Sequence, residues 1–328
     1  MQDSHITPLK KAVVSPAFWF CTKVLLLLFL LGYVAVELFY QQDLAQQFDR
    51  LGYSLIQRGW SPVYLLVLLL VPLNWFLEIL KWRTLLRPLT SISLVRAAKG
   101  VLTGLSLGFM TPHSLGDYLG RVGHLQHENR MESLGAILFG RGAQFISTLL
   151  FGLVGLWAWY RAENTLWVLL VFCGCLLGMT TLLGMFLLAR EPFVRGCKRY
   201  WPSAHKFIKV MSQYSLREVW AVFGYSCLRY MVFASQFLLL LYWLQTPLPL
   251  TVLGAGVTWV LLAKSVIPAF NFLSDLGVRE FSALYFFGLY AISPAPVLTA
   301  SLSIWILNIL IPTLVGAVFI IPMKLTKP

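Results

Sequence analysis

The stretch Met110-Thr-Pro-His-Ser-Leu-Gly-Asp-Tyr-Leu-Gly-Arg121 decides how the rest of the sequence is interpreted. It places proline, glycine and charged residues inside an apolar segment, 93–123, that otherwise suits a membrane helix. Broken backbone at membrane depth is tolerated only where protein or a water-filled cavity satisfies the freed amide and carbonyl groups. We therefore expect a re-entrant or discontinuous helical hairpin, with Pro112 and Gly116 at its break.

A second apolar segment, 250–290, is interrupted in the same way. Its centre reads Ile267-Pro-Ala-Phe-Asn-Phe-Leu-Ser-Asp-Leu-Gly-Val-Arg-Glu280, which places Pro268 and Gly277 at the expected break. Paired broken segments in corresponding positions of two halves are the best sequence pointer to a transporter site near the bilayer midplane. The alternative is that proline and glycine merely kink two ordinary membrane helices, where both residues are common.

The rest of the chain consists mainly of apolar segments. Of its 328 residues 58% are hydrophobic and only 12% are charged, whereas a soluble domain carries about twice that charged fraction. Segments long and apolar enough to cross a bilayer cover residues 19–40, 62–80, 131–160, 166–189, 219–244 and 297–321. The composition therefore argues against soluble enzymes. It predicts an all-α integral membrane protein, a single transmembrane domain over residues 1–328 with six full spans and two opposed re-entrant hairpins.

The distribution of basic residues predicts the orientation of these segments. The net charge of +13 would suggest nucleic acid binding in a soluble protein, but here Lys and Arg lie between the apolar segments. With a cytoplasmic N-terminus, nineteen of them, Lys81 included, fall in inside segments and three in outside loops. This bias requires each hairpin to return to the side from which it came. It predicts cytoplasmic N- and C-termini and an inverted repeat of two halves, about 1–163 and 164–328.

Charged residues accompany both breaks. Asp117 and Arg121 are four residues apart, so they share a helix face and can pair, and Asp275, Arg279 and Glu280 follow the second break. A helix that begins after a break directs free amide groups at an anion, and arginine adds a bidentate partner for phosphate or carboxylate. We expect these residues to line a substrate site. The alternative is that they form buried ion pairs that lock the hairpins against the spans.

Three further cations lie at apparent membrane depth, where each costs about 2.5 to 3.5 kcal/mol on insertion scales. They are Arg141, Arg229 and Lys264. Neither arginine has an acidic residue within a helical turn in its own span, so we expect both to be without an ion-pair partner and to face a common interior cavity.

The sequence offers little for metal or cofactor chemistry. The run His124-x-x-His127-Glu128 could be imagined as a metal site, but two histidines and one acid are far short of a defined coordination set. We expect no metal, no cofactor and no catalytic residues.

Several of these runs resemble the lysylphosphatidylglycerol synthase transmembrane, or flippase-like, family. They are Gly108-Phe-Met-Thr-Pro112, Gly116-Asp117 with Arg121, Gly140-Arg141 and Leu276-Gly-Val-Arg-Glu280. The resemblance covers essentially the whole chain. It implies a bacterial inner-membrane protein with paired re-entrant helices, associated in the best-known member with moving an aminoacylated phospholipid between leaflets.

Three features depart from that family. Asp117 stands where a glutamate is common, and Asn271-Phe-Leu-Ser-Asp275 replaces a usual Pro-Gly-Gly run, which would stiffen the second break. The chain also stops at Pro328 without a soluble synthase domain, so we expect no aminoacyl-transfer activity.

The sequence as a whole favours a lipid transporter that moves an anionic or phosphate-bearing lipid or glycolipid between leaflets. Its expected partners are membrane lipids and their anionic headgroups, and not nucleic acid. Two alternatives stay open: a membrane-embedded enzyme of lipid or polyprenyl-phosphate metabolism, and a transporter of a small solute or ion. The enzyme would need a nucleophile, a His–acid pair or a metal cluster, and we find none of these in the sequence.

The predicted orientation can be tested at Leu248, between Pro247 and Pro249 in an expected outside loop. In a background without the five native cysteines, Leu248→Cys should react with a membrane-impermeant maleimide added outside intact cells. Labelling of this position from the cytoplasmic side alone would contradict the orientation.

Overall fold

The structure is a computed structural model, and it is helical throughout the part that it describes. That part comprises residues 25, 49–50, 52–57, 61–111, 114–125, 130–187, 190–200, 205, 207, 209–267 and 272–321. Its elements are α3 (Pro62–Leu86), α4 (Leu94–Met110), α5 (Leu115–Val122), α6 (Arg130–Glu163), α7 (Leu166–Leu187), α8 (Arg190–Tyr200), α10 (Val210–Gln213), α11 (Leu216–Trp243), α12 (Leu250–Val266), α13 (Phe272–Gly288), α14 (Pro294–Trp305), η3 (Ile306–Leu310), α15 (Ile311–Ala317) and η4 (Val318–Ile320).

Five helices in the described residues are long and apolar enough to cross a membrane. They are α3, α6, the Leu166–Gly184 part of α7, α11 and the continuous helix Pro294–Ile320, which joins α14 to η4. Each coincides with a predicted span. The first predicted span, 19–40, lies outside the described residues apart from Leu25.

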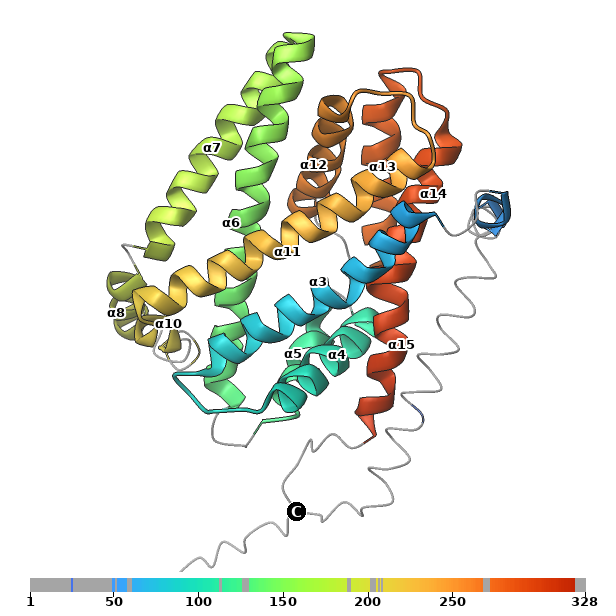
Figure 1. Cartoon of the computed structure of the whole chain (residues 1–328). Coiled ribbons are helices and arrows are strands. Elements are labelled where there is room, and N and C mark those ends of the chain that lie inside the picture. Colours follow the sequence, from blue (N-terminus) through green and yellow to red (C-terminus); the bar gives the residue numbers. More distant parts are fainter. Residues whose placement is uncertain are drawn as a thin grey trace, which may run out of the picture.

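The starts of α3 and α11 are encoded locally. Ser61 caps α3 by accepting a hydrogen bond from the backbone amide of Tyr64 at 3.2 Å, and a proline follows at the first helical position. Ser215 and Glu218 form a reciprocal capping box at the start of α11. These two helices then cross the molecule side by side on a diagonal, whereas α6 and α7 run together along its length (Figure 1).

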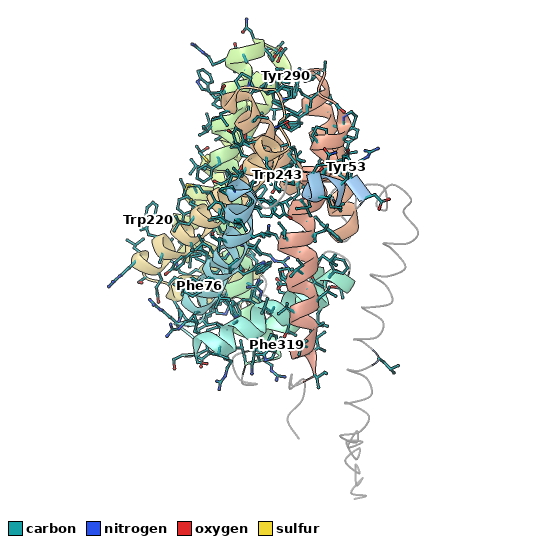
Figure 2. The ribbon with its side chains drawn as sticks, turned by 45° about the vertical axis from the view of Figure 1, so that its right-hand side comes forward. Tyr53, Phe76, Trp220, Trp243, Tyr290 and Phe319 are labelled. Atoms are coloured by element: carbon teal, nitrogen blue, oxygen red, sulfur yellow. The ribbon has the colours of Figure 1, made fainter. Side chains whose placement is uncertain are left out.

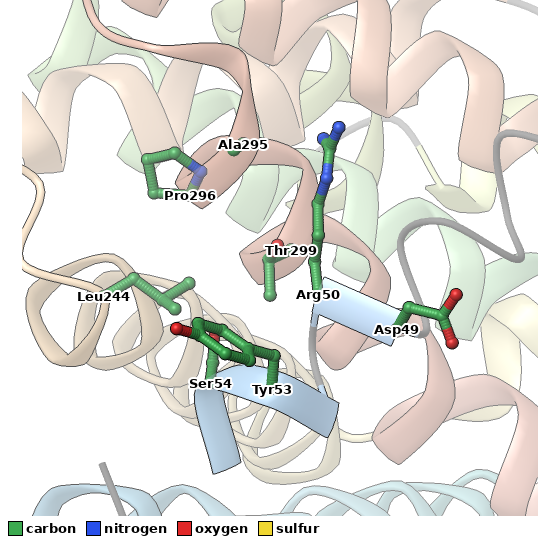
Figure 3. A pocket seen from close by; sticks show the side chains of 8 residues that line it. All are labelled: Asp49, Arg50, Tyr53, Ser54, Leu244, Ala295, Pro296 and Thr299. Carbon is green, nitrogen blue, oxygen red and sulfur yellow. The ribbon is translucent and has the colours of Figure 1, made fainter. Parts of the chain in front are cut away.

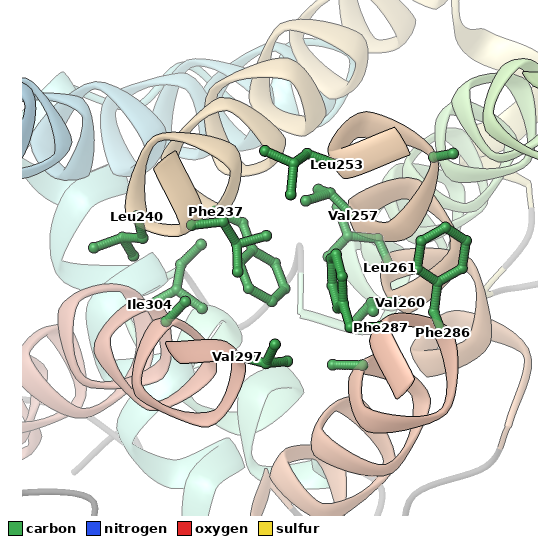
Figure 4. Packing of buried hydrophobic residues seen from close by; sticks show 14 of the residues in the cluster. Phe237, Leu240, Leu253, Val257, Val260, Leu261, Phe286, Phe287, Val297 and Ile304 are labelled. Atoms are coloured by element: carbon green, nitrogen blue, oxygen red, sulfur yellow. The ribbon is translucent and has the colours of Figure 1, made fainter. Parts of the chain in front are cut away.

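The largest apolar core lies where α11, α12, α13 and α14 meet. Figure 4 shows Phe237 of α11 facing side chains of α12 and α13, such as Val257 and Phe287, across the packed interior. All three of these side chains are almost fully buried. Burial of such apolar area holds these four helices together.

Many large apolar side chains are exposed on the outer surface, which is expected of a protein that lies in lipid. Only 6% of the apolar stretch of α7 is buried, and its Leu170 and Leu177 are 63% and 70% exposed. Figure 2 shows Trp220 projecting from the outer edge, where it is 55% exposed. The chain is therefore a multi-pass membrane protein.

The first broken segment, 93–123, contains the two helices α4 and α5, which pack against each other. The break between them is closed at Thr111, whose hydroxyl accepts a hydrogen bond from the Gly116 amide at 2.6 Å. Ser114 follows in the left-handed conformation with φ of 55°. Pro112 and Pro268, the other predicted break residues, lie outside the described residues.

Both glycines predicted at the breaks are part of helices. Gly116 falls within α5 and Gly277 within α13, because a glycine costs a helix interior only about 1 kcal/mol and packing can offset that. In α4 and α5 the glycines allow close approach: a Cβ atom on Gly120 would overlap the backbone of Gly104, and one on Gly116 would overlap the carbonyl of Leu107.

This close packing predicts that Gly120→Ala destabilises the fold. The added methyl group forces α4 and α5 apart, and overpacking of this kind typically costs about 1 to 3 kcal/mol. Thermal unfolding in detergent measures the effect. Gly178→Ala, on α7 where nothing lies within 4 Å of an added Cβ, is the control and should leave the melting temperature unchanged or slightly raised. Equal melting temperatures for the two variants would show that the α4–α5 contact is not tight.

Candidate functional site

The site begins with a polar stripe on α3. Asn74, Glu78 and Lys81 are spaced four and three residues apart, so they lie on one face of the helix. They are only 1%, 3% and 3% exposed, although the helix around them is strongly apolar. The sequence analysis missed Glu78 altogether and counted Lys81 as a loop residue. The stripe itself was visible as polar residues at helical spacing within a predicted span.

Glu78 is the centre of the site. Its Oε1 atom pairs with Arg121 at 2.9 Å, and its Oε2 atom pairs with Lys81 at 2.7 Å and with Arg229 at 2.6 Å. One buried carboxylate therefore joins cations from α3, α5 and α11. The placement of Lys81 corrects the expectation that it is a solvated cytoplasmic residue, because α3 continues beyond the predicted span end to Leu86.

Asp117 forms the second centre. Its Oδ1 atom accepts from Arg121 Nε at 2.7 Å, as the sequence predicted, and its Oδ2 atom accepts from Arg141 Nη2 at 3.0 Å. Arg121 bridges the two carboxylates, because it contacts Asp117 with one nitrogen and Glu78 with another. The carboxylates and cations thus form one continuous network across α3, α5, α6 and α11.

Each arginine of the network also lies over an aromatic ring. Arg121 is 5.4 Å from the ring centroid of Trp82, Arg229 is 5.2 Å from Trp75, and Arg141 is 4.5 Å from Tyr118. Cation–π contacts partly compensate a guanidinium for lost hydration. Protein groups therefore replace most of the water around Arg121 and Arg229 and part of the water around Arg141, which is 41% exposed.

The network encloses a cavity of about 160 Å³. Its wall consists of Glu78, Lys81, Leu85, Asp117, Arg121, Ile137, Gly140, Arg141, Gln144 and Arg229. Four formal positive charges and two negative charges line it, which leaves an excess of two positive charges. At about 30 Å³ per water molecule, the space suits a small polar group and not a whole lipid.

The carboxylate oxygens that line the cavity all have hydrogen-bond partners, whereas some of the arginine nitrogens have none in the described part of the chain. All four carboxylate oxygens of Glu78 and Asp117 accept from a cation. Among contacts of the described residues, by contrast, Nε and Nη1 of Arg141 and Nη2 of Arg229 have no protein acceptor. The cavity has unused arginine donors and two excess positive charges, and each carboxylate oxygen is already paired with a cation, so it suits an anion that accepts hydrogen bonds.

The predicted site residues divide into two groups. Asp117, Arg121, Arg141 and Arg229 lie together on the cavity. The expectation that Arg141 and Arg229 have no ion-pair partner was wrong, because Asp117 and Glu78 reach them from other helices. A search for acids within one span cannot detect such partners.

The described residues of the second broken segment are not among those that line this cavity. Arg279 is fully buried and donates from Nε to Ser301 Oγ at 3.0 Å, and Glu280 follows it in α13. Lys264 lies 5.8 Å from the ring centroid of Phe233. The Asp275 side chain lies outside the described part of the structure.

A second cavity of about 460 Å³ lies between residues 49–54, the end of α11 and the start of α14 (Figure 3). Its described lining has a single cation, Arg50, and a single carboxylate, Asp49. The two cavities share no lining residue, and this one has no buried charge network.

The described residues contain no group of three or more His, Cys, Asp or Glu side chains that could bind a metal ion. His124 hydrogen-bonds with Thr103 Oγ1 at 3.0 Å. Burial, assisted by Lys99, lowers the pKa of His124 to about 4, so its ring is neutral near pH 7. His127 and Glu128 lie outside the described residues.

The two carboxylates should differ in their importance for stability. Glu78→Gln leaves three cations without their shared partner, whereas Asp117→Asn affects two, one of which, Arg141, is 41% exposed. Breaking a buried ion pair typically costs about 3 to 5 kcal/mol, so Glu78→Gln should lower the melting temperature in detergent more than Asp117→Asn. Glu132→Gln, in the first turn of α6, is the control with little expected change. A larger loss in Asp117→Asn would place the centre of the network at the wrong carboxylate.

Comparison with known proteins agrees with this architecture. A family model described as the lysylphosphatidylglycerol synthase TM region matches residues 13–316, and no match was found among curated proteins. The match covers nearly the whole chain, and the chain therefore belongs to the lysylphosphatidylglycerol synthase TM-region family.

Proposed function

We propose that this member of the lysylphosphatidylglycerol synthase TM-region family is a transporter that moves an anionic or phosphate-bearing lipid or glycolipid between membrane leaflets. The observation that carries the proposal is the buried cavity with two excess positive charges and unused arginine donors. An anionic headgroup would supply the missing acceptors. A cationic headgroup would meet only carboxylate oxygens that are already engaged.

The size of the cavity fits one part of such a lipid. A space of about 160 Å³ can hold a phosphate or carboxylate group, while the acyl chains stay outside, where apolar faces such as that of α7 meet lipid. Arg141 is the most exposed of the four cations, at 41%, and Arg229 follows at 24%. We infer that these two arginines make the first contact with the headgroup.

The proposal includes the architecture expected from the sequence. Helix α5 has eight residues, or about 12 Å of length, which is far less than the roughly 30 Å thickness of the hydrocarbon core. This length supports a re-entrant hairpin formed by α4 and α5. We extend the same interpretation to α12 and α13, and to an inverted repeat in a bacterial inner membrane with both termini cytoplasmic.

The role proposed here is transport and not catalysis. The supporting observation is that the charges of the described cavity satisfy one another in ion pairs, and no described nucleophile is paired with a base there. Lys81 and both carboxylates are held by partners, and the donors left over belong to arginines, which bind anions without exchanging protons.

Reconstitution into vesicles tests the proposal. Fluorescent phosphatidylglycerol should move between leaflets faster than fluorescent phosphatidylcholine in the presence of the wild-type protein. Arg141→Gln and Arg229→Gln should each slow this movement roughly tenfold or more, because a charge-assisted hydrogen bond contributes about 1.5 to 3 kcal/mol. The readout is the rate at which the fluorescent lipid becomes accessible to a membrane-impermeant quencher.

A matched control is Arg217→Gln, on the same helix as Arg229 but exposed near its start. This variant should transport at the wild-type rate. Equal rates for the anionic and zwitterionic lipids, or unchanged rates in both cavity variants, would contradict the proposed function. Uptake of inorganic phosphate without lipid movement would instead indicate a solute transporter.

A further inference from the structure

A chain of side-chain hydrogen bonds leads from the charged cavity into the last membrane helix. Arg229 Nε donates to Asn74 Oδ1 at 3.1 Å, and Asn74 Nδ2 donates to Asn308 Oδ1 at 2.8 Å. Asn308 Nδ2 then donates to Gln236 Oε1 at 3.1 Å, and Gln236 Nε2 donates to the carbonyl of Val67 at 3.0 Å. Asn74, Asn308 and Gln236 are at most 2% exposed.

The direction of this chain is imposed from the arginine end. A guanidinium can only donate hydrogen bonds, so Asn74 must present its oxygen to Arg229 and its amide nitrogen to Asn308. Asn308 must in turn present its oxygen to Asn74. The orientation of each amide therefore follows from the charge of Arg229, and the position of Arg229 depends on the amides that hold it.

Asn308 occupies an unusual position in the backbone. It lies in the π-helical turn η3, four residues before Pro312. Proline has no amide hydrogen, and its ring clashes with the carbonyl four residues earlier, so the helix widens before it. Single π-helical turns of this kind are frequent at functional sites. Here the turn contains the residue that contacts α3 and α11.

The same helix also contacts α4, which packs against the cavity-lining helix α5. The hydroxyl of Ser106 on α4 donates to the carbonyl of Thr313 at 2.5 Å, and a Cβ atom on Gly316 would overlap the carbonyl of Leu102. Helix α4 in turn packs on α5, where Gly104 leaves room for the Asp117 carboxylate. The last helix therefore contacts α3, which carries Glu78, and α4, which packs on the helix that carries Asp117.

We propose that Asn308 is a positioning residue that holds the Arg229 guanidinium toward the cavity through Asn74. Arg229 is 24% exposed, so its contacts with Asn74, Glu78 and Trp75 fix where its spare nitrogen points. Without Asn308 the Asn74 amide loses its acceptor and is free to turn, and Arg229 loses the support on one side. What Arg229 binds there rests on the proposed function, but its position does not.

Nuclear magnetic resonance of the protein with ¹⁵N-labelled arginine in detergent tests the position without any ligand. The Nε–H signal of Arg229, identified by its loss in Arg229→Lys, should exchange slowly with solvent in the wild-type protein. In Asn308→Leu, which is close in size, this signal should shift and exchange at least several times faster. The Nε–H signal of Arg121 should stay unchanged, because this group donates to Asp117 and is not part of the hydrogen-bond chain through Asn308.

Two further variants separate positioning from general stabilisation. Asn308→Asp keeps an acceptor oxygen for the Asn74 amide, so in this variant the Arg229 Nε–H should still exchange slowly with solvent. Trp259→Phe removes a hydrogen bond between α12 and α13, from Nε1 to the Ser282 carbonyl, and should leave Arg229 unaffected even if it lowers the melting temperature. If Asn308→Leu does not fold, Gln236→Leu removes the next link and should also speed the exchange of Arg229.

An unchanged Arg229 signal in a folded Asn308→Leu, or in a folded Gln236→Leu, overturns the inference, as does an equal change caused by Trp259→Phe. The proposed function fails on a different observation, the absence of any preference for anionic lipid in vesicles. Asn308→Leu should also slow the movement of phosphatidylglycerol. If the double variant Asn308→Leu and Arg229→Gln is no slower than Arg229→Gln alone, the two residues act as one unit.

Discussion

The structure depends on one costly interaction, the burial of the Glu78 carboxylate among three cations in the middle of an apolar bundle. Removing charges from water costs several kcal/mol per ion even in real proteins, and buried ion pairs often gain no net stability over apolar residues of the same size. The network is therefore a poor device for stability. It is a good device for holding arginines at fixed positions inside a membrane protein, where a mobile charge would otherwise move to the surface.

This interaction places demands on the helices around it. Charges from α3, α5, α6 and α11 reach one another only if these helices approach closely, and glycine makes that approach possible. Gly104 admits the Asp117 carboxylate, and Gly120 admits the backbone of α4. The glycines of the first broken segment therefore serve packing. Between α4 and α5, the Thr111 hydroxyl accepts a hydrogen bond from the Gly116 amide, and Ser114 has the left-handed conformation.

Much of the architecture could be predicted from the sequence, because the hydropathy of a membrane helix is a signal carried by many residues at once. Five predicted spans correspond to helices, and the first interrupted segment corresponds to the two helices α4 and α5. Local spacing also predicted the pair formed by Asp117 and Arg121. Glu78 and Lys81 are also only three residues apart in α3, so their pairing was within reach of the same spacing rule, although Glu78 was missed. The contacts between helices join residues 24 to 155 positions apart. No spacing rule within one helix predicts such contacts, and so Arg141 and Arg229 were expected to have no ion-pair partners.

The two kinds of contact around Arg229 explain how one cavity can be both firmly built and open to a ligand. The carboxylate of Glu78 satisfies its charge at 2.6 Å, whereas the neutral amide of Asn74 constrains its direction at 3.1 Å. An arriving anion need not break the ion pair, because the guanidinium keeps a third nitrogen for it. Arg141 is also held by a carboxylate, because its Nη2 donates to Asp117 Oδ2 at 3.0 Å, and its Nε and Nη1 have no acceptor among the described residues. Two arginines that are each held by one acid thus keep unused donors beside the same cavity, which is the arrangement that the proposed binding of an anionic headgroup requires.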